Sequence, residues 1–220
     1  MNTKQEALEV VIGELERNLA SLEAGYQSAV ANLNALRKCV DKDDLTRLLR
    51  RGAFMRELHN LLYKSKLEGC EVSLMMIDLD HFKRVNDTYG HQTGDVVLER
   101  VSQLIKQFMR PQDLAGRYGG EEIIVAVQAG AIEVEEIAEN IRKAVEAHRM
   151  VSVSAIQFNV TLSMGVASTQ EFKFGADVLN VLIREADAAL YRAKDTGRNK
   201  VVKAELKIAP VFNIVEAMAA

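Results

Sequence analysis

A regular apolar repeat at the start of the chain restricts that segment to one kind of structure. Its apolar residues follow alternating steps of four and three, at Leu8, Ile12, Leu15, Leu19, Leu22, Tyr26, Ala29, Leu33, Leu36 and Val40. This is the spacing of the a and d positions of a coiled coil. An amphipathic helix lying on its own domain is the alternative, but such a helix usually carries a wider apolar stripe. We therefore predict that residues 1–42 form a helix that pairs two copies as a parallel homodimer.

Length and composition allow one further domain. The chain has 220 residues and a net charge of −3, which argues against general binding to nucleic acid or anionic membranes. Neither Cys39, at a g position of the repeat, nor Cys70 belongs to a cluster with zinc-site spacing, so we expect reduced thiols. There is no signal-peptide pattern, and no apolar run approaches the roughly 18 residues of a membrane span. These features predict a cytoplasmic protein without a membrane span, whose input arrives either through the cytoplasm or through an unidentified sensory partner.

Residues 41–44 break the repeat, and the remaining chain alternates between helical and strand patterns. The apolar spacing predicts helices over residues 51–66, 96–109, 132–148 and 176–193. It predicts strands over residues 72–79, 114–118, 122–127 and 200–206, and one or two strands within 156–169. Residues 81–95 are rich in polar side chains and are expected to form a helical turn and a loop. The order indicates an α/β domain over residues 43–207, with an antiparallel hairpin in its sheet and a tail at 208–220.

Two glycines and two carboxylates stand immediately before a continuous apolar run. Gly119-Gly120-Glu121-Glu122 leads into Ile123–Val127, which predicts a tight turn before a buried strand. Glycines allow positive φ and the close approach of a ligand. Because a carboxylate pair beside a buried strand is costly without a cation, a cation-binding site is one interpretation of this pattern. A hairpin with solvated acids at its tip is the alternative.

A third carboxylate, Asp78, ends the apolar run of residues 72–79. If that strand neighbours the one after Glu122, these acids meet at one sheet edge, where they suit Mg²⁺ together with substrate phosphates. Phosphate-binding cations are available at Lys83, Lys194 and Arg198, and the side chains of Asn86 and Asp95 match the hydrogen-bonding edge of guanine. The combination predicts metal-assisted nucleotidyl transfer, with ordinary surface charges as the alternative.

The order and spacing of these motifs resemble the GGDEF-domain diguanylate cyclases, which condense two GTP into cyclic di-GMP. The resemblance covers about residues 43–202 and includes the segments Asp43–Thr46, Asp78–Lys83, Asn86–His91, Gly94–Asp95, Arg117–Ile123 and Gly197–Asn199. It implies a nucleotide-cyclase-like, palm-like domain with a mostly antiparallel central sheet flanked by helices. The variant here is Gly-Gly-Glu-Glu-Ile, in which Glu121 replaces the commoner Asp and Ile123 replaces Phe.

The resemblance also implies roles for single residues at the catalytic turn. Asp78, Glu122 and the carbonyl of Leu79 would hold the metal, which is Mg²⁺ or alternatively Mn²⁺, with two ions per half-site. Glu121 would lie nearest the attacking 3′-hydroxyl and help to deprotonate it. Gly119 and Gly120 would let the turn lie against the nucleotide.

The same resemblance implies how GTP binds. The backbone amides of Phe82 and Lys83, together with the side chains of Lys194 and Arg198, would hold the triphosphate. Asn86 and Asp95 would bind guanine, and Asp95 has the form expected for cyclic di-GMP rather than a mixed dinucleotide. Because one domain holds one GTP, two protomers must face each other across a two-fold axis, which gives the 1–42 helix its predicted task.

Arg110-Pro111-Gln112-Asp113 is similar to the family's inhibitory Arg-x-x-Asp site, which binds the product cyclic di-GMP. Arginine suits this role because its planar guanidinium forks onto guanine or phosphate and stacks on a base. A surface charge pair at a helix end is the alternative, and Arg142 is predicted to add a second contact.

Residues 45–54 depart from the family pattern at Arg47, Arg50 and Gly52, which bears on how the helix is coupled to the domain. Two other functions stay open from the sequence alone. One is a degenerate domain that only senses cyclic di-GMP, and the other is a helix that docks the enzyme onto another protein.

Overall fold

The structure is a computed structural model that describes residues 3–169 and 177–205, and within the first helix it describes the side chains of residues 12–33. The chain divides into two compact units, Met1–Lys42 and Asp43–Ala220. Segments 170–176 and 206–220 lie outside the described residues, and with them the predicted tail and the start of the predicted helix 176–193.

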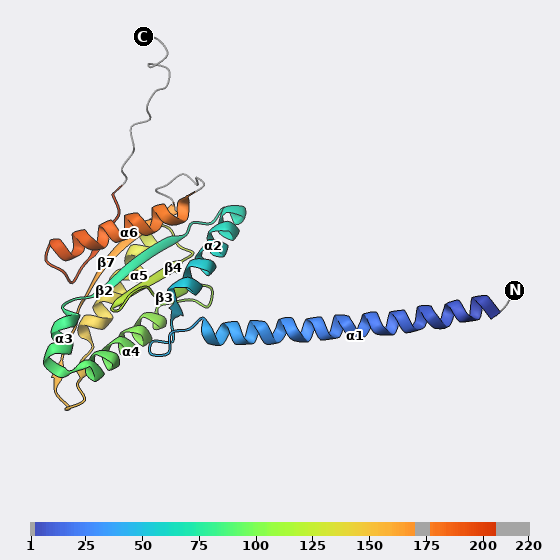
Figure 1. Cartoon of the computed structure of the whole chain (residues 1–220). Coiled ribbons are helices and arrows are strands. Elements are labelled where there is room, and N and C mark those ends of the chain that lie inside the picture. The colour runs from blue at the N-terminus through green and yellow to red at the C-terminus, as the bar shows by residue number, and fades with distance from the viewer. Residues whose placement is uncertain (1–2, 170–176, 206–220) are drawn as a thin grey trace, which may run out of the picture. The chain divides into compact units, whose positions relative to one another are not determined.

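The first unit is a single helix, α1 (Thr3–Val40), which confirms the helical part of the prediction (Figure 1). Its repeat residues are largely exposed, with exposed fractions of 45% at Ile12, 61% at Leu15, 71% at Leu22 and 62% at Leu33. A leucine stripe of this kind would usually be buried against another surface, because each such side chain gains about 1.5–3 kcal/mol on burial.

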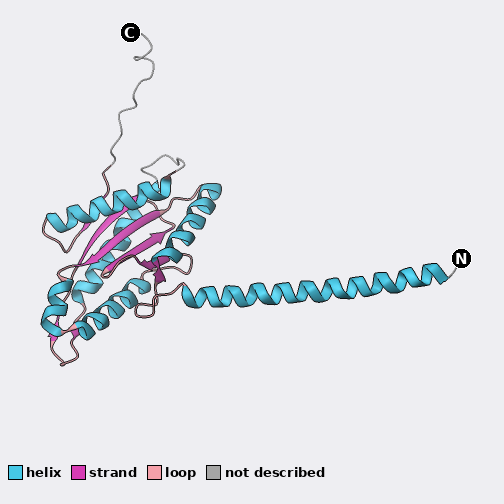
Figure 2. Ribbon diagram, in the orientation of Figure 1, coloured by secondary structure: helices cyan, strands magenta, loops and turns pink. Residues whose placement is uncertain are grey.

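The second unit is built on a mixed sheet with the strand order β1-β3-β4-β2-β7-β8 (Figure 2). The strands are β1 (Leu49–Arg50), β3 (Leu114–Arg117), β4 (Glu122–Val127), β2 (Ser73–Leu79), β7 (Leu162–Ser168) and β8 (Val201–Lys203). The three inner pairings are antiparallel, whereas β1 and β8 pair in parallel at the two edges. The predicted α/β class and the antiparallel hairpin are therefore confirmed.

Helices cover both faces of this sheet (Figure 1). Helices α4 (His91–Gln107) and α5 (Ala131–Ala147) pack on the face that carries Met75 and Ile77 of β2. Helices α2 (Arg51–Glu68) and α6 (Val178–Asp195) pack on the face that carries Leu74 and Met76. Because alternate residues of β2 point to opposite faces, a strand covered on both sides must be apolar throughout, as its sequence predicts.

Four elements differ from the prediction. Residues 82–89 form a full helix, α3 (Phe82–Tyr89), and α4 already begins at His91, so the expected loop is wrong. Gly90, with φ of 84°, makes the sharp corner between these helices, which polar composition alone could not indicate. The two-residue strand β1 was missed, as was β5 (Met150–Val151), which pairs with β6 (Gln157–Phe158), because pairs this short carry no periodicity.

Candidate active site

The predicted acidic edge exists in the sheet. Strands β2 and β4 are antiparallel neighbours, and their register pairs Asp78 directly with Glu122. Asp78 is 4% exposed, whereas Glu121 and Glu122 are half-buried at the start of β4. The carboxylates of Asp78 and Glu122 therefore lie at the same end of two adjacent central strands, as predicted. We call this end of the strands the acidic sheet edge.

The Gly-Gly turn connects β3 to β4. The amides of Tyr118 and Gly119 donate to the carbonyl of Glu122 at 2.8 and 3.3 Å. A Cβ on residue 119 would lie 2.4 Å from Glu122 Oε2, so a larger residue here would displace the carboxylate of Glu122 from its place against the turn. A Cβ on Gly120 would meet nothing within 4 Å, which leaves that face open to a ligand. Neither glycine has positive φ, so that part of the prediction is wrong and close approach explains Gly119.

Arg117 hydrogen-bonds both the Gly-Gly turn and Asp43. Its Nε and Nη2 donate to the carbonyl of Gly120 at 3.2 and 2.8 Å, while Nη1 donates to both Asp43 oxygens at 3.2 and 3.3 Å. Burial acts to raise the pKa of Asp43, but hydrogen bonds from Thr46 and the charge of Arg117 outweigh it and hold the pKa below its ordinary value. Arg117 thus links the segment that follows residue 42 to the Gly-Gly turn, a contact that the sequence motifs did not predict.

Lys194 provides the cation that the buried acid requires. This residue lies in the last turn of α6, and its Nζ is 2.8 Å from Asp78 Oδ2. Helix α6 packs closely on β7, since a Cβ on Gly165 would lie 2.1 Å from the Ala186 carbonyl oxygen. The glycine therefore sets the distance at which α6 presents Lys194 to the sheet edge.

Burial dominates the electrostatics of this edge. It raises the pKa of Asp78, an effect that Lys194 and Arg198 oppose and the negative charge of Asp80 reinforces. Burial also raises the pKa of Glu121, and the charges of Asp78 and Glu122 add to the rise against that of Lys194. A site in which carboxylates are protonated more readily than usual is one that would gain from a bound cation.

The donor set fits a metal ion that is also held by its substrate. Within residues 3–169 and 177–205, no three Asp, Glu, His or Cys side chains are grouped to hold an ion alone. Asp78, Glu122 and the carbonyl of Leu79 would supply an incomplete oxygen shell. Mg²⁺ in nucleotide sites commonly takes only one or two carboxylates and completes its shell with phosphates and water, so an incomplete set is what such a site needs.

Asn86 and Asp95 occupy adjoining helices. A Cβ on Gly94 would lie 1.9 Å from Asn86 Oδ1, so the glycine is needed for the amide to lie against the first turn of α4. Asp95 follows directly and is exposed. The structure thus brings together the two residues predicted to bind guanine.

The residues predicted to bind the triphosphate lie where β2 ends. Phe82 and Lys83 open α3, directly after His81 at φ of 57°. The first amides of a helix have no acceptor within it and are available to an anion. Arg198 lies in the turn after α6, also at positive φ, and its charge acts on Asp78.

Asp80 is a residue whose role the sequence did not reveal. It is 6% exposed and accepts hydrogen bonds from Thr161 Oγ1 at 2.7 Å, Ser163 Oγ at 2.6 Å and the Asn199 amide at 3.0 Å. Only the spacing of two acids around Leu79 could have drawn attention to it. Its carboxylate accepts three hydrogen bonds from two segments, residues 161–163 and Asn199, and therefore helps to hold the site together.

The predicted product site is brought together only in part. The Arg110 amide donates to Asp113 Oδ2 at 2.7 Å, and the Arg110 guanidinium is paired with Glu133, in the first turn of α5. Arg142 lies nine residues further along α5, or about 13 Å at 1.5 Å per residue, and is bonded to Glu139, Glu146 and Asn199. The structure does not bring Arg142 to Arg110 and Asp113.

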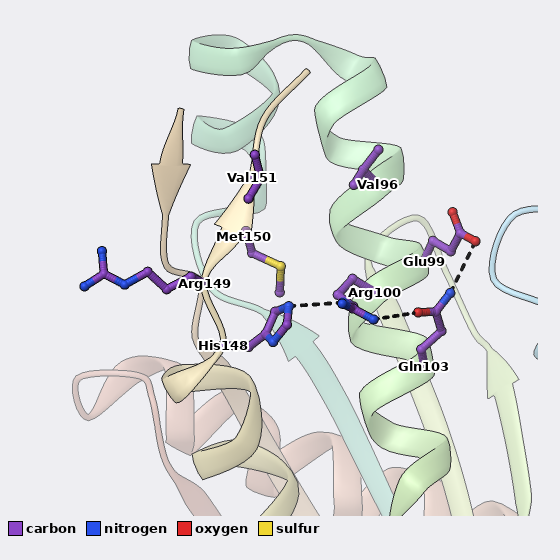
Figure 3. Close-up of a pocket in the computed structure, with 8 residues that line it drawn as sticks. All are labelled: Val96, Glu99, Arg100, Gln103, His148, Arg149, Met150 and Val151. Carbon is purple, nitrogen blue, oxygen red and sulfur yellow. Dashed lines mark hydrogen bonds between the residues drawn. The ribbon is translucent and has the colours of Figure 1, made fainter. Parts of the chain in front are cut away.

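A separate hollow of about 320 Å³ lies between α4 and residues 148–151 (Figure 3). Arg100 crosses it and donates to His148 Nε2 at 3.1 Å and to Gln103 Oε1 at 3.1 Å, while the side chain of Arg149 points away from it. None of the predicted site residues lines this hollow, so it is not the active site.

Comparisons with known proteins agree with this geometry. The family model described as "Diguanylate cyclase, GGDEF domain" matches residues 40–200. Diguanylate cyclase A of Treponema denticola is 37% identical over 192 residues, which cover 86% of this chain and 51% of that protein. The response regulator PleD of Caulobacter vibrioides is 38% identical over 162 residues, covering 73% and 35%. The chain thus spans about half the length, or less, of these curated relatives.

Solved structures match the fold. The coiled coil and GGDEF domain of DgcB from Caulobacter crescentus, in complex with c-di-GMP, has a TM-score of 0.73 and 33% identity, covering 86% of this chain and 99% of that one. The diguanylate cyclase SiaD of Pseudomonas aeruginosa, in complex with its activator SiaC, has a TM-score of 0.74 and 33% identity, covering 92% and 76%. No helix in the described part of the chain is long and apolar enough to cross a membrane. Because the family model covers most of the chain and includes the acidic sheet edge with its Gly-Gly turn, this protein belongs to the family of GGDEF-domain diguanylate cyclases.

Proposed function

We propose that this protein is a diguanylate cyclase that condenses two GTP into cyclic di-GMP and releases two pyrophosphates. The observation that carries the proposal is the pairing of Asp78 with Glu122 beside the Gly-Gly turn, with Lys194 at 2.8 Å. The relatives named diguanylate cyclase and the DgcB complex with c-di-GMP support the same reaction.

One GTP would bind to each domain. Asn86 and Asp95 would hydrogen-bond the guanine, and the amides of Phe82 and Lys83 would cradle the phosphates. Lys194 and Arg198 would neutralise the triphosphate. Because Lys194 now pairs with Asp78, we expect it to exchange this partner for a phosphate oxygen when nucleotide and metal bind.

Asp78, Glu122 and the Leu79 carbonyl would hold Mg²⁺, or Mn²⁺ in its place, with two ions per half-site. When bound, these ions would neutralise charge on the phosphates and assist departure of pyrophosphate. The raised pKa of Asp78, caused first by burial, is consistent with a carboxylate whose charge Lys194 compensates only in part and which a bound metal ion would compensate further.

Glu121 would serve as the proton acceptor. The 3′-oxygen of one GTP forms a bond to the α-phosphorus of the other, the bond from that phosphorus to pyrophosphate breaks, and the 3′-hydroxyl proton moves to Glu121. The pKa of Glu121 is raised by burial and by Asp78 and Glu122, which brings it closer to the value suited to a base at neutral pH. Repeating the step on the second phosphate closes the ring.

Both steps need two half-sites that face each other, one GTP in each. The exposed a and d residues of α1 support the proposal that residues 1–42 hold two copies together and raise the effective concentration of the half-sites. The SiaD–SiaC complex supports the further proposal that a protein partner controls the activity.

Product would inhibit through Arg110 and Asp113. The hydrogen bond from the Arg110 amide to the Asp113 carboxylate fixes the loop. Because the Arg110 guanidinium is paired with Glu133, cyclic di-GMP would have to displace the Glu133 carboxylate. An exposed ion pair contributes little, about 0–1 kcal/mol, and can be displaced by a bidentate ligand.

Incubation of the dimeric protein with GTP and Mg²⁺ tests the proposal. We expect cyclic di-GMP and pyrophosphate in a ratio of one to two, identified by chromatography and mass spectrometry. A dimer that binds cyclic di-GMP but turns over no GTP would contradict it and favour the sensor.

A further inference from the structure

The turn after α6 has an unusual backbone. Gly197, Arg198 and Asn199 follow one another at φ of 113°, 61° and 46°. Glycine adopts such angles readily and asparagine more readily than most residues, but arginine does so only where surrounding contacts hold it. The amide of Arg198 donates to the carbonyl of Ala193 at 2.9 Å, which closes the helix end but does not fix the residue that follows.

Asn199 is fixed from two directions. Its amide donates to the buried carboxylate of Asp80 at 3.0 Å. Its side-chain Oδ1 accepts from Arg142 Nη1 at 2.8 Å, and its Nδ2 donates to Glu146 Oε1 at 2.7 Å. The backbone is thus tied to the sheet, and the side chain is tied to helix α5.

Arg142 is held for this contact by its own helix. Its Nε and Nη2 donate to Glu139 at 2.9 and 2.7 Å, and Nη1 also donates to Glu146 at 2.8 Å. The side chain is only 11% exposed, so the guanidinium is presented to Asn199 in one orientation. These contacts leave it directed at the 197–199 turn and not at Arg110.

We propose that Arg142 is a positioning residue for the triphosphate, which acts through Asn199 to hold Arg198 in the conformation that faces the acidic sheet edge. This inference rests on the proposed function, because it assigns Arg198 to the phosphates. It replaces the sequence-based expectation that Arg142 contacts the inhibitory product.

Binding measured without turnover tests this directly. The probe is a GTP analogue with a methylene group between the α- and β-phosphorus, titrated by calorimetry into the full chain with Mg²⁺. Loss of one charge-assisted contact predicts that Arg142→Ala weakens binding about tenfold. Guanosine, which has no phosphates, should bind as it does to the unmodified protein. Equal weakening for both probes would mean a general structural defect and would overturn the proposal.

A double-mutant cycle identifies the path of the effect. If Arg142 acts through Arg198, then Arg142→Ala should change affinity less than about twofold in an Arg198→Ala background. Additive losses would contradict the proposal. Lys143→Ala is the matched control, because Lys143 is the next residue of α5, is 64% exposed and pairs only at 3.8 Å with Glu139. It should leave affinity unchanged.

Asn199→Gly provides a second test of the proposal if the Arg142→Ala variant does not fold. Glycine tolerates the positive φ but removes both side-chain bonds, so analogue affinity should still fall, and unchanged affinity would overturn the inference. Affinity for cyclic di-GMP separates the positioning role of Arg142 from the product-site role. Arg142→Ala should leave this affinity unchanged. If the variant instead loses affinity for cyclic di-GMP and keeps its affinity for the GTP analogue, Arg142 belongs to the product site and the proposal is overturned. If the unmodified protein does not bind the analogue, the proposed function itself fails.

Discussion

The apolar repeat residues of helix α1 are largely exposed, whereas the apolar residues of the central sheet are largely buried. All seven residues of β2 are buried, whereas Leu15, Leu19 and Leu22 of α1 are 61%, 58% and 71% exposed. Each unit is equally regular in sequence, but the sheet finds its partners within one chain. The difference shows that the domain buries its apolar residues within one chain, and it supports the proposal that the helix needs a second surface.

The proposed chemistry divides in the same way. One domain would supply the acids, a cation and the guanine-binding residues Asn86 and Asp95 for one nucleotide, but no second 3′-hydroxyl. The comparison therefore predicts that damage to the sheet edge stops the chemistry without affecting assembly, and that damage to the helix stops assembly without affecting nucleotide binding.

The largest effect is expected from Asp78→Asn. The amide keeps the shape but removes the charge that would hold the metal, so several kcal/mol of transition-state stabilisation should be lost and turnover should fall by about 10⁴-fold. Turnover is measured by pyrophosphate release, and the dimer fraction by light scattering, which should not change. Asp187→Asn, at an exposed position of α6, is the control. Retained turnover in Asp78→Asn would remove this residue from the site.

The next effect is expected from Leu15→Lys combined with Leu22→Lys. Two charges on each helix would face the same charges on the partner helix. The dimer would also lose four leucines, two from each copy, that it would otherwise bury, so dimerisation should weaken at least about 10³-fold. Analytical ultracentrifugation measures the shift, and affinity for the GTP analogue should stay within twofold. Ala24→Lys with Ala31→Lys, at f positions outside the repeat, should leave the dimer intact. A dimer that survives the leucine changes would assign the pairing to another surface.

A smaller effect concerns pH. Because the pKa of Glu121 is raised by burial and neighbouring charge, its unprotonated fraction, and the rate with it, should fall as pH falls through that raised value. Glu121→Gln should lower kcat by about 10²-fold and remove this acidic limb from the pH profile. If the limb persists in the variant, another group is the base.

The smallest effect is expected from Glu133→Gln. It releases Arg110 from its ion pair, so inhibition by cyclic di-GMP should become severalfold tighter, in line with about 1 kcal/mol for an exposed pair. Glu136→Gln, on the same helix, is the control. Inhibition constants that remain unchanged in Glu133→Gln while Arg110→Ala relieves inhibition would show that the ion pair does not compete with product.

The sequence predicted those parts of the molecule that depend on local pattern. Spacing along the chain predicted the repeat of α1 and the apolar run of β2, because it determines which face of a helix or strand a residue occupies. The order of Asp78, the glycines and Glu122 predicted the acidic sheet edge in the same way. The contacts of Asp80, Arg117 and Arg142 were not, because each joins segments far apart in the chain. Asp80 reaches Asn199 across 119 residues, and no local pattern carries such a pairing.

The dependence of turnover on protein concentration tests the central claim most directly. For the unmodified dimer, activity per protomer should be constant over the concentrations at which it stays dimeric. For the variant with Leu15→Lys and Leu22→Lys, activity per protomer should rise in proportion to concentration, because two separate half-sites must meet. A monomeric variant whose activity per protomer does not depend on concentration would contradict the account, since one domain would then complete the reaction alone.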